Sequence, residues 1–220
     1  ATTEDFKEDA RAGIDLLRER FARVGVLGHS EGGTIALMLA AEGKTDFVVS
    51  LAGMVVSGAR TLLAQNHAAL LQAGFPESET IRYCDALEKA FAQISAGEQP
   101  AASIDDYDLP EALRQNYKLA ITQFLTPYMR YFITLDATKL LGQVRCPVLA
   151  LNGTKDTQVD AATNLGALEE GLPAARIIRC EGLNHLFQHC TTGQSEEYKL
   201  IEETISEEVL SDIATWIRKL

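Results

Sequence analysis

The sequence predicts an α/β protein with a parallel sheet whose two faces are covered by helices. Four short apolar runs have the length of buried strands and lie at residues 24–27, 47–51, 146–151 and 175–180. Helix-like stretches separate or follow these runs, and strands that alternate with helices are typical of parallel sheets. With 220 residues, 46% of them hydrophobic and 23% charged, the chain is long enough to bury one main core.

The first elements are a helix, a strand and a second helix. Residues 5–21 carry apolar side chains at steps of three and four with charged residues between them, which predicts an amphipathic helix. The strand 24–27 follows, and an alanine-rich helix over 33–42 is expected to end at Gly43. The second strand, 47–51, comes next.

The middle of the chain changes to helical patterns without a convincing strand. Helices are predicted at residues 61–73, 78–95, 110–124 and 127–135. Ser78 is a plausible N-cap of the second of these. We therefore expect residues 55–143 to form a helical cap insertion, while residues 1–54 and 144–220 form the α/β core.

Strand signals return after the insertion. The strand 146–151 precedes a turn and a helix over 160–170, and the strand 175–180 precedes a long loop, 181–197. A final amphipathic helix is predicted at 206–220. The alternation of strand and helix thus resumes in the last third of the chain.

The most informative motif is Gly-His-Ser-Glu-Gly at residues 28–32, directly after the first predicted strand and directly before the alanine-rich helix. A serine on such a tight strand-to-helix turn is a nucleophile elbow. The turn strains the serine backbone, and we expect a Cβ at Gly28 or Gly32 to collide with the neighbouring strand or helix. Ser30 is therefore predicted to face a substrate.

These glycines allow two other interpretations. The plain one is a Gly/Ser loop that caps a helix. The other is a dinucleotide-binding loop, which needs G-x-G-x-x-G spacing and an acid at the far end of the next strand. That spacing is absent, and Asp46 precedes the strand 47–51, so it lies at the wrong end.

A serine nucleophile needs a base within hydrogen-bond reach, and the base needs an acid that fixes its tautomer. Asp156 follows the third predicted strand and His185 follows the fourth. Because the strands are expected to be parallel, both side chains would come from the same end of the sheet as Ser30. The sequence therefore predicts a triad of Ser30, Asp156 and His185.

Each of the two predicted partners of Ser30 has an alternative interpretation. Asp156 could be a turn or cap residue, but Asp160 is the better cap for the helix that follows. His189 is the main competitor of His185 for the role of base. His29 lies within the elbow, where such a side chain more often packs than reacts.

With these residues in view, the chain resembles the α/β-hydrolase superfamily of serine hydrolases, most closely the bacterial esterase and acyl-peptidase-like branches with a helical cap. The resemblance rests on residues 28–32, 151–156 and 182–185 and covers nearly the whole chain. It implies an acyl-enzyme mechanism with Ser30 as nucleophile, His185 as general base and acid and Asp156 as its orienting acid. The backbone N–H of Glu31 would be one oxyanion donor.

The chain departs from that family at its beginning. The family places four strands and a helix before the elbow strand, and a loop after its third strand supplies the second oxyanion donor. We therefore expect this chain to be the C-terminal part of a longer polypeptide. The isolated chain is expected to turn over substrate slowly, since a missing oxyanion donor costs about 10² to 10³ in rate. The flank of the first strand would be uncovered, which predicts self-association through that edge or a rearranged sheet.

The charge and cysteine content of the chain limit the partners and cofactors that it is expected to bind. A formal net charge of −11 disfavours nucleic acid or an anionic membrane, which require a basic surface. The four cysteines show no metal-site spacing, so no metal or other cofactor is expected, and they are interpreted as reduced thiols, although Cys180 and Cys190 could approach each other. No signal peptide or bilayer-spanning stretch is present in the sequence, which leaves the compartment open: cytoplasmic by default, extracytoplasmic if an upstream segment carries a signal.

Four functions remain open. The first is a serine hydrolase that cleaves a small carboxylic ester or acyl substrate, and the second is a serine peptidase or acyl-peptidase that uses the same triad. The third is a binding module without catalytic activity on a hydrolase-like fold, which the missing oxyanion segment favours and the Ser-Asp-His order disfavours. The fourth is another reaction on the same fold, such as acyl transfer or lactone hydrolysis, because fold alone does not select the substrate.

Overall fold

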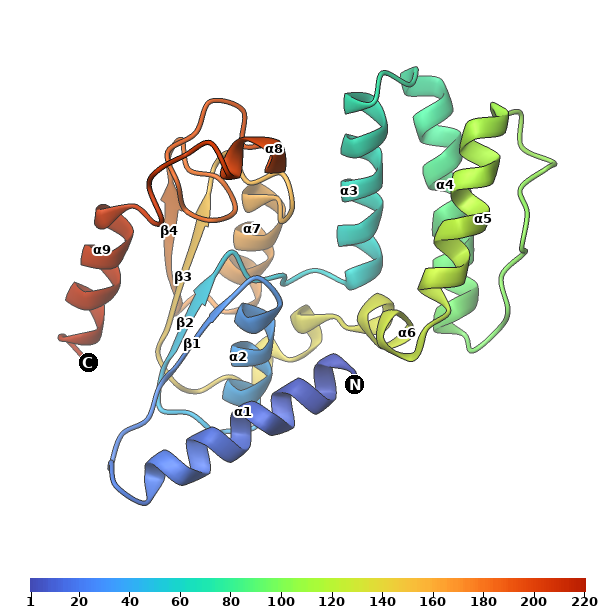
Figure 1. Cartoon of the computed structure of the whole chain (residues 1–220). Coiled ribbons are helices and arrows are strands. Elements are labelled where there is room, and N and C mark those ends of the chain that lie inside the picture. The colour runs from blue at the N-terminus through green and yellow to red at the C-terminus, as the bar shows by residue number, and fades with distance from the viewer. The chain divides into compact units, whose positions relative to one another are not determined.

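A computed structural model describes all 220 residues, which form two compact units (Figure 1). The sheet unit consists of residues 4–56 and 136–220, and the helical unit consists of residues 1–3 and 57–135.

The sheet unit contains four parallel strands in the order β1-β2-β3-β4, as the sequence predicts. These strands are β1 (Val26–His29), β2 (Val48–Leu51), β3 (Val148–Gly153) and β4 (Arg176–Cys180). β1 begins and ends two residues later than expected. The N–H of Ser30 still donates to the carbonyl of Leu51 at 2.8 Å, which keeps the end of β1 paired to β2. β1 therefore leads directly into Ser30.

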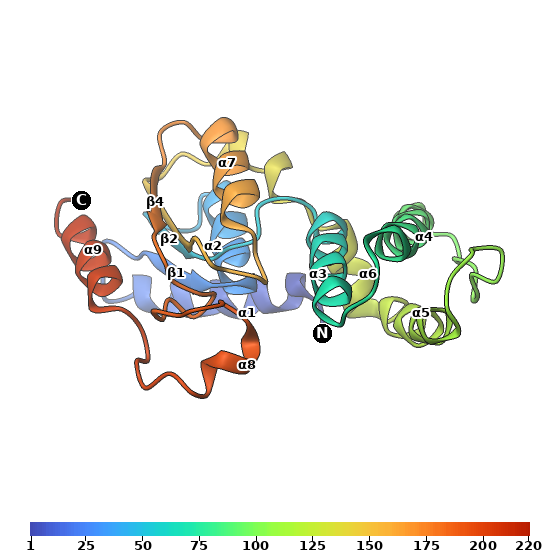
Figure 2. The same ribbon diagram turned by 90° about the horizontal axis from the view of Figure 1, so that it is seen from above.

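Helices cover both faces of this sheet. α2 (Glu31–Ala41) and α7 (Ala161–Gly171) lie on one face and α9 (Glu207–Ile217) on the other (Figure 2). Alternate strand residues explain the two layers: Val48, Val148 and Ala150 pack against α2 and α7, whereas Val49, Leu149 and Leu151 pack against α9. α1 (Thr3–Arg18) packs on α2 through Ile14 and Leu39.

β1 lies at an open edge, because it pairs only with β2. The N–H groups of Val26 and Ser30 bond to the β2 side, so the backbone groups of the alternate residues Leu27 and His29 point away from β2. The Leu27 side chain is also 53% exposed. The sheet is not rearranged, but its first strand has the uncovered flank that the sequence predicts.

The helical unit has its own core. Its helices are α3 (Gly58–Gln72), α4 (Glu77–Ser95), α5 (Glu111–Phe124) and α6 (Pro127–Thr134). Their shared core contains the fully buried side chains of Tyr83, Leu87, Phe91, Leu113 and Tyr117. α4 begins at Glu77, not after a Ser78 cap, because the N–H groups of Glu79 and Thr80 already donate to the carbonyl of Pro76.

Short helical turns occupy the remaining connections. Two 3-10 turns, Ala137–Lys139 and Leu141–Gln143, lead into β3, and α8 (Ser195–Tyr198) begins inside the predicted loop 181–197. All four cysteines are free thiols. The Cys190 thiol donates a hydrogen bond to the carbonyl of Gly182 at 3.4 Å.

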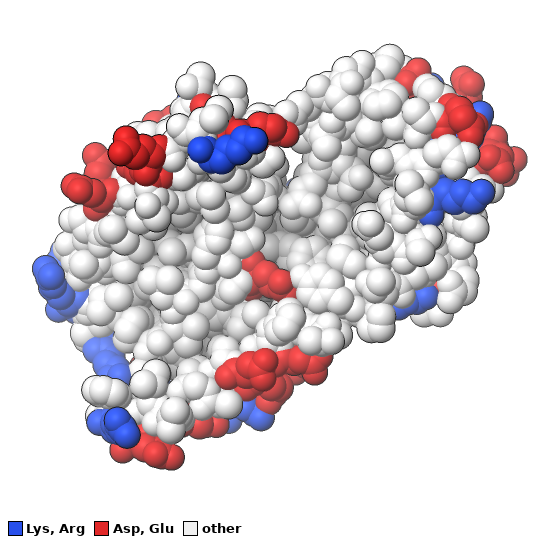
Figure 3. Space-filling view, viewed as in Figure 1, with Lys and Arg blue, Asp and Glu red and all other residues white.

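None of the helices combines the length and apolar character that a bilayer crossing requires. On the face that Figure 3 shows, Lys and Arg side chains lie in small separate groups interspersed with Asp and Glu, without a continuous basic surface.

Candidate active site

Ser30 lies on a strained turn between β1 and α2. Its backbone has φ 55° and ψ −122°, a conformation that residues with a side chain rarely adopt. A Cβ on Gly28 would collide with the carbonyl of Gly32 and lie 2.8 Å from the nitrogen of Gly33. Only glycine at position 28 therefore allows β1 to turn so sharply into the helix.

The expectation for Gly32 was wrong. A Cβ added there would meet no atom within 4 Å, so this glycine is not required by packing. The close approach occurs one residue later: a Cβ on Gly33 would lie 2.8 Å from Gly53 Cα and 2.8 Å from the Ser50 hydroxyl. Gly33 is the position at which α2 packs directly on the chain that leaves β2.

Asp156 and His185 meet beyond the ends of β3 and β4. The Nδ1 atom of His185 is 2.7 Å from Oδ2 of Asp156, and both side chains are almost fully buried. A carboxylate only accepts hydrogen bonds, so Nδ1 carries the proton and donates it to Asp156. In the neutral ring, Nε2 is then the unprotonated nitrogen and is free to act as a base.

The second oxygen of Asp156 is also satisfied. Its Oδ1 accepts hydrogen bonds from the backbone N–H groups of Gln158 and Val159, at 2.8 Å each. Three hydrogen bonds thus fix the carboxylate in a buried site, where an unpaired charge would be costly. Asp160 in turn caps α7 by accepting from the N–H of Thr163 at 2.7 Å, as predicted.

The loop that carries His185 is held from within and from the Asp156 loop. The buried Asn184 side chain accepts from the N–H groups of Leu186 and Gln188. Lys155 ties the two loops together, because its N–H donates to the carbonyl of Leu183 and its ammonium group donates to the carbonyls of Cys190 and Thr191, all at 3.0 Å.

His185 also reaches the elbow. Its ring lies 4.6 Å from the ring of His29, centroid to centroid, and its carbonyl oxygen is 2.8 Å from Nε2 of His29. His29 directly precedes Ser30, so the predicted base and the predicted nucleophile belong to contacting segments. His189 faces elsewhere: its ring pairs with Glu203 and is 62% exposed.

Glu31 is the first residue of α2. Its N–H lies at the N-terminal end of that helix, where the helix dipole favours negative charge. This is the position at which an oxyanion next to Ser30 would be stabilised.

Sequence reasoning missed the contributions of His29, Asn184 and Lys155. The sequence offers a weak signal for Asn184 alone, because this residue directly precedes His185 in a short turn that begins at Gly182. For His29 and Lys155 the partners lie 156 and 35 residues away, so no short motif could have indicated them.

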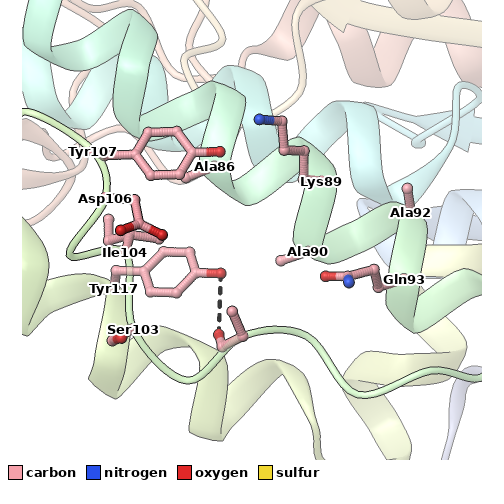
Figure 4. A pocket seen from close by; sticks show the side chains of 11 residues that line it. Ala86, Lys89, Ala90, Ala92, Gln93, Ser103, Ile104, Asp106, Tyr107 and Tyr117 are labelled. Carbon is pink, nitrogen blue, oxygen red and sulfur yellow. Dashed lines mark hydrogen bonds between the residues drawn. The ribbon is translucent and has the colours of Figure 1, made fainter.

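A separate cavity of about 460 Å³ lies within the helical unit, between α4, α5 and the loop before α5 (Figure 4). Lys89 and Asp106 lie at its margin, and the Lys89 ammonium group is 5.2 Å from the centroid of the Tyr107 ring. The hydroxyl of the buried Tyr117 donates to the carbonyl of Ala101 at 3.4 Å. None of the predicted triad residues lines this cavity.

Comparison with known structures gives the same fold. The structure is similar to a proline iminopeptidase of Mycobacterium smegmatis (TM-score 0.51, 15% identity, covering 99% of this chain and 72% of that one). It is also similar to a serine hydrolase involved in carbazole degradation (TM-score 0.51, 12% identity, 100% and 72%). An esterase of Pyrococcus furiosus has a TM-score of 0.50 at 16% identity, with 100% and 63% covered.

At these identities the similarity shows a shared fold. The chain spans less than two thirds of the length of the Pyrococcus furiosus esterase. A search of curated protein sequences finds no match.

The sequence model of the α/β hydrolase family matches residues 1–193. This range includes the elbow, the Asp156 loop and the His185 loop, and the parallel sheet agrees with it. The chain belongs to the α/β hydrolase family.

Proposed function

We propose that this chain provides the Ser-His-Asp triad of a serine hydrolase that cleaves carboxylic esters. The observation that carries the proposal is the buried hydrogen bond of 2.7 Å between His185 Nδ1 and Asp156 Oδ2, next to the strained Ser30 turn. A buried His–Asp pair that leaves Nε2 unprotonated is the arrangement that activates a serine hydroxyl.

The reaction follows from these roles. The Ser30 hydroxyl attacks the ester carbonyl carbon while Nε2 of His185 takes its proton, and the imidazolium that forms is stabilised by Asp156. The tetrahedral intermediate then collapses with cleavage of the bond between the carbonyl carbon and the alkoxide oxygen. His185 gives its proton to this oxygen, so the alcohol leaves and the acyl group stays bonded to Ser30 as the acyl-enzyme. Water attacks the acyl carbonyl with His185 again as base, which releases the acid and restores Ser30.

Negative charge on the carbonyl oxygen develops in both steps. The N–H of Glu31 is proposed as one donor to that oxyanion, supported by its position at the start of α2. The triad and this donor are compatible with either an ester or an amide substrate.

A peptidase remains the alternative, since a proline iminopeptidase shares the fold. The two are separated by comparing p-nitrophenyl butyrate with alanine p-nitroanilide as substrates of the full chain. We expect the ester to be turned over and the anilide to remain at the background rate, because a peptidase would also cleave the more reactive ester but would cleave the anilide as well. Cleavage of the anilide above that rate would contradict the ester assignment and leave the triad assignment intact.

Variants test the triad. Ser30→Ala and His185→Ala are expected to lower kcat for p-nitrophenyl butyrate at least about 10³-fold. His189→Ala is the matched control, because that exposed ring pairs with Glu203 and does not contact Asp156 or His29; its kcat should stay near that of the wild type. Equal loss in the two histidine variants would contradict the choice of base.

A further inference from the structure

His29 makes two separate contacts with His185. Its Nε2 atom is 2.8 Å from the His185 carbonyl oxygen, and the two rings lie 4.6 Å apart with an angle of 51° between their planes. Phe187 lies on the same loop, with its ring centroid 6.3 Å from that of His29 in an edge-on arrangement. One side chain from β1 therefore contacts the backbone and the ring of the predicted base.

The hydrogen bond assigns the tautomer of His29. A carbonyl oxygen only accepts, so Nε2 of His29 must carry a proton and donate it. The neutral ring then has its other nitrogen unprotonated. This is the arrangement of a residue that holds a partner in place, because the donor is used up by a backbone carbonyl and is not directed at a substrate.

The charge state of His29 suits this role. Desolvation of the ring against its neighbours is the largest effect and lowers the pKa of His29 below the ordinary value of 6.5, although the residue as a whole is exposed to solvent. Two titratable groups face it: His185 raises the pKa through the hydrogen bond to its carbonyl and lowers it through its ring, and the charge of Asp156 raises it. The ring is therefore neutral at neutral pH and adds no positive charge beside His185.

Other hydrogen bonds of the His185 loop join it to the Asp156 loop and to α9. The His185 loop is fixed to the Asp156 loop through Lys155, and to α9 through Phe187, whose carbonyl accepts from the N–H of Ser206 at 2.8 Å. The His29 contact instead spans 156 residues and joins the loop to β1, the strand that carries Ser30. It is a direct contact between the loop of the predicted base and the strand that leads into the predicted nucleophile.

We propose that His29 is a positioning residue that holds His185 against the nucleophile elbow, through its ring and its hydrogen bond to the His185 carbonyl. The inference rests on the proposed function, in which His185 is the base. It assigns to the second residue of the Gly-His-Ser-Glu-Gly motif a role in aligning the triad.

Three variants of the full chain separate the hydrogen bond from the ring. His29→Gln keeps an N–H donor at the position of Nε2, His29→Phe keeps a ring without a donor, and His29→Ala keeps neither. With p-nitrophenyl butyrate we expect kcat to fall about tenfold in the Phe variant, the size of one net hydrogen bond, and further in the Ala variant. The Gln variant should retain kcat within about threefold, and KM should change less than about twofold in all three.

A matched control and a second readout accompany these rates. His189→Gln makes the same exchange on the same loop and should leave kcat and KM unchanged. Proton NMR of the resonance of the His185 Nδ1 proton, which lies far downfield when bonded to a carboxylate, reports the geometry without turnover. We expect it to be sharp in the wild type and in the Gln variant, and broadened in the Phe and Ala variants.

The outcomes separate the inference from the proposed function. If kcat and the Nδ1 resonance are unchanged in the Phe and Ala variants, or if the Gln variant is as impaired as the Ala variant, the positioning role is wrong. If the wild type does not turn over the ester, the proposed function fails, and the NMR comparison still decides whether His29 holds His185. Should the Ala variant fail to fold by circular dichroism, the comparison of Gln with Phe decides the case.

Discussion

At the scale of single residues, Asp156 is the group whose chemistry can be changed with the least change of shape. In Asp156→Asn the amide oxygen can still accept from Gln158 and Val159, but the side chain no longer requires the proton of His185 to be on Nδ1. We expect kcat to fall by about 10⁴ while the midpoint of thermal unfolding changes little. Ester hydrolysis and a thermal melt measure the two.

The control for this change lies four residues along. Asp160→Asn makes the same exchange at the N-cap of α7, and asparagine caps helices as well as aspartate does. Its kcat should equal that of the wild type. A similar loss of activity in both variants would show that Asp156 acts through the structure of the loop alone.

The turn that follows His185 is expected to lose stability in acid, because it is held by the carboxylate of Glu197. Its carboxylate accepts from the N–H groups of Thr191, Thr192 and Gly193, which lower the pKa of Glu197 to about 2. Because this value lies below the ordinary 4.5, the stabilisation is complete above about pH 4.5 and is lost as the pH falls toward 2.

We therefore expect Glu197→Gln to lower the unfolding midpoint at pH 7, with a difference from the wild type that shrinks toward zero near pH 2. Thermal melts across this range measure it, and Glu202→Gln, at an exposed carboxylate, should show no such trend. A wild-type minus Glu197→Gln difference that is constant with pH would contradict the proposed cause.

At the scale of elements, the turn from β1 into α2 depends on Gly28 and Gly33, and not on Gly32. Gly28→Ala places a Cβ against the backbone of Gly32 and Gly33, which cannot move without shifting the helix. We expect a loss of about 1–3 kcal/mol in the free energy of unfolding, measured by urea denaturation.

Gly32→Ala is the matched control one turn away. The added methyl group meets open space, and alanine favours a helix by up to about 1 kcal/mol over glycine. Its stability should equal or exceed that of the wild type. If Gly32→Ala were as destabilising as Gly28→Ala, the account of the turn would be incorrect.

At the scale of the whole molecule, self-association through β1 stays a prediction. Its edge presents unpaired backbone groups and a 53% exposed Leu27. Light scattering at rising protein concentration, in salt that screens the charge of −11, should show association that Leu27→Lys weakens. Leu119→Lys, at a 71% exposed position on α5, is the control. A chain that remains monomeric at every concentration would contradict the prediction.

The sequence predicts those parts of the molecule that depend on local patterns of a few consecutive residues. The elbow, the four strands and the loops that carry Asp156 and His185 follow from local patterns and from the rule that parallel strands end at one edge. The closeness of Gly33 to Gly53, and of His29 to His185, depends on how distant segments approach. Such contacts leave no trace in a five-residue motif, so the importance of Gly32 was misjudged and the role of His29 was missed.

Ser30 is proposed to be a nucleophile that His185 and Asp156 activate. The most direct measurement is the reaction of the full chain with a fluorophosphonate, which forms a covalent bond with an activated serine, followed by intact mass and peptide mapping. We predict one adduct per chain, located on Ser30 and absent in Ser30→Ala. A folded wild-type chain that stays unlabelled, or an adduct on any other residue, would contradict this prediction.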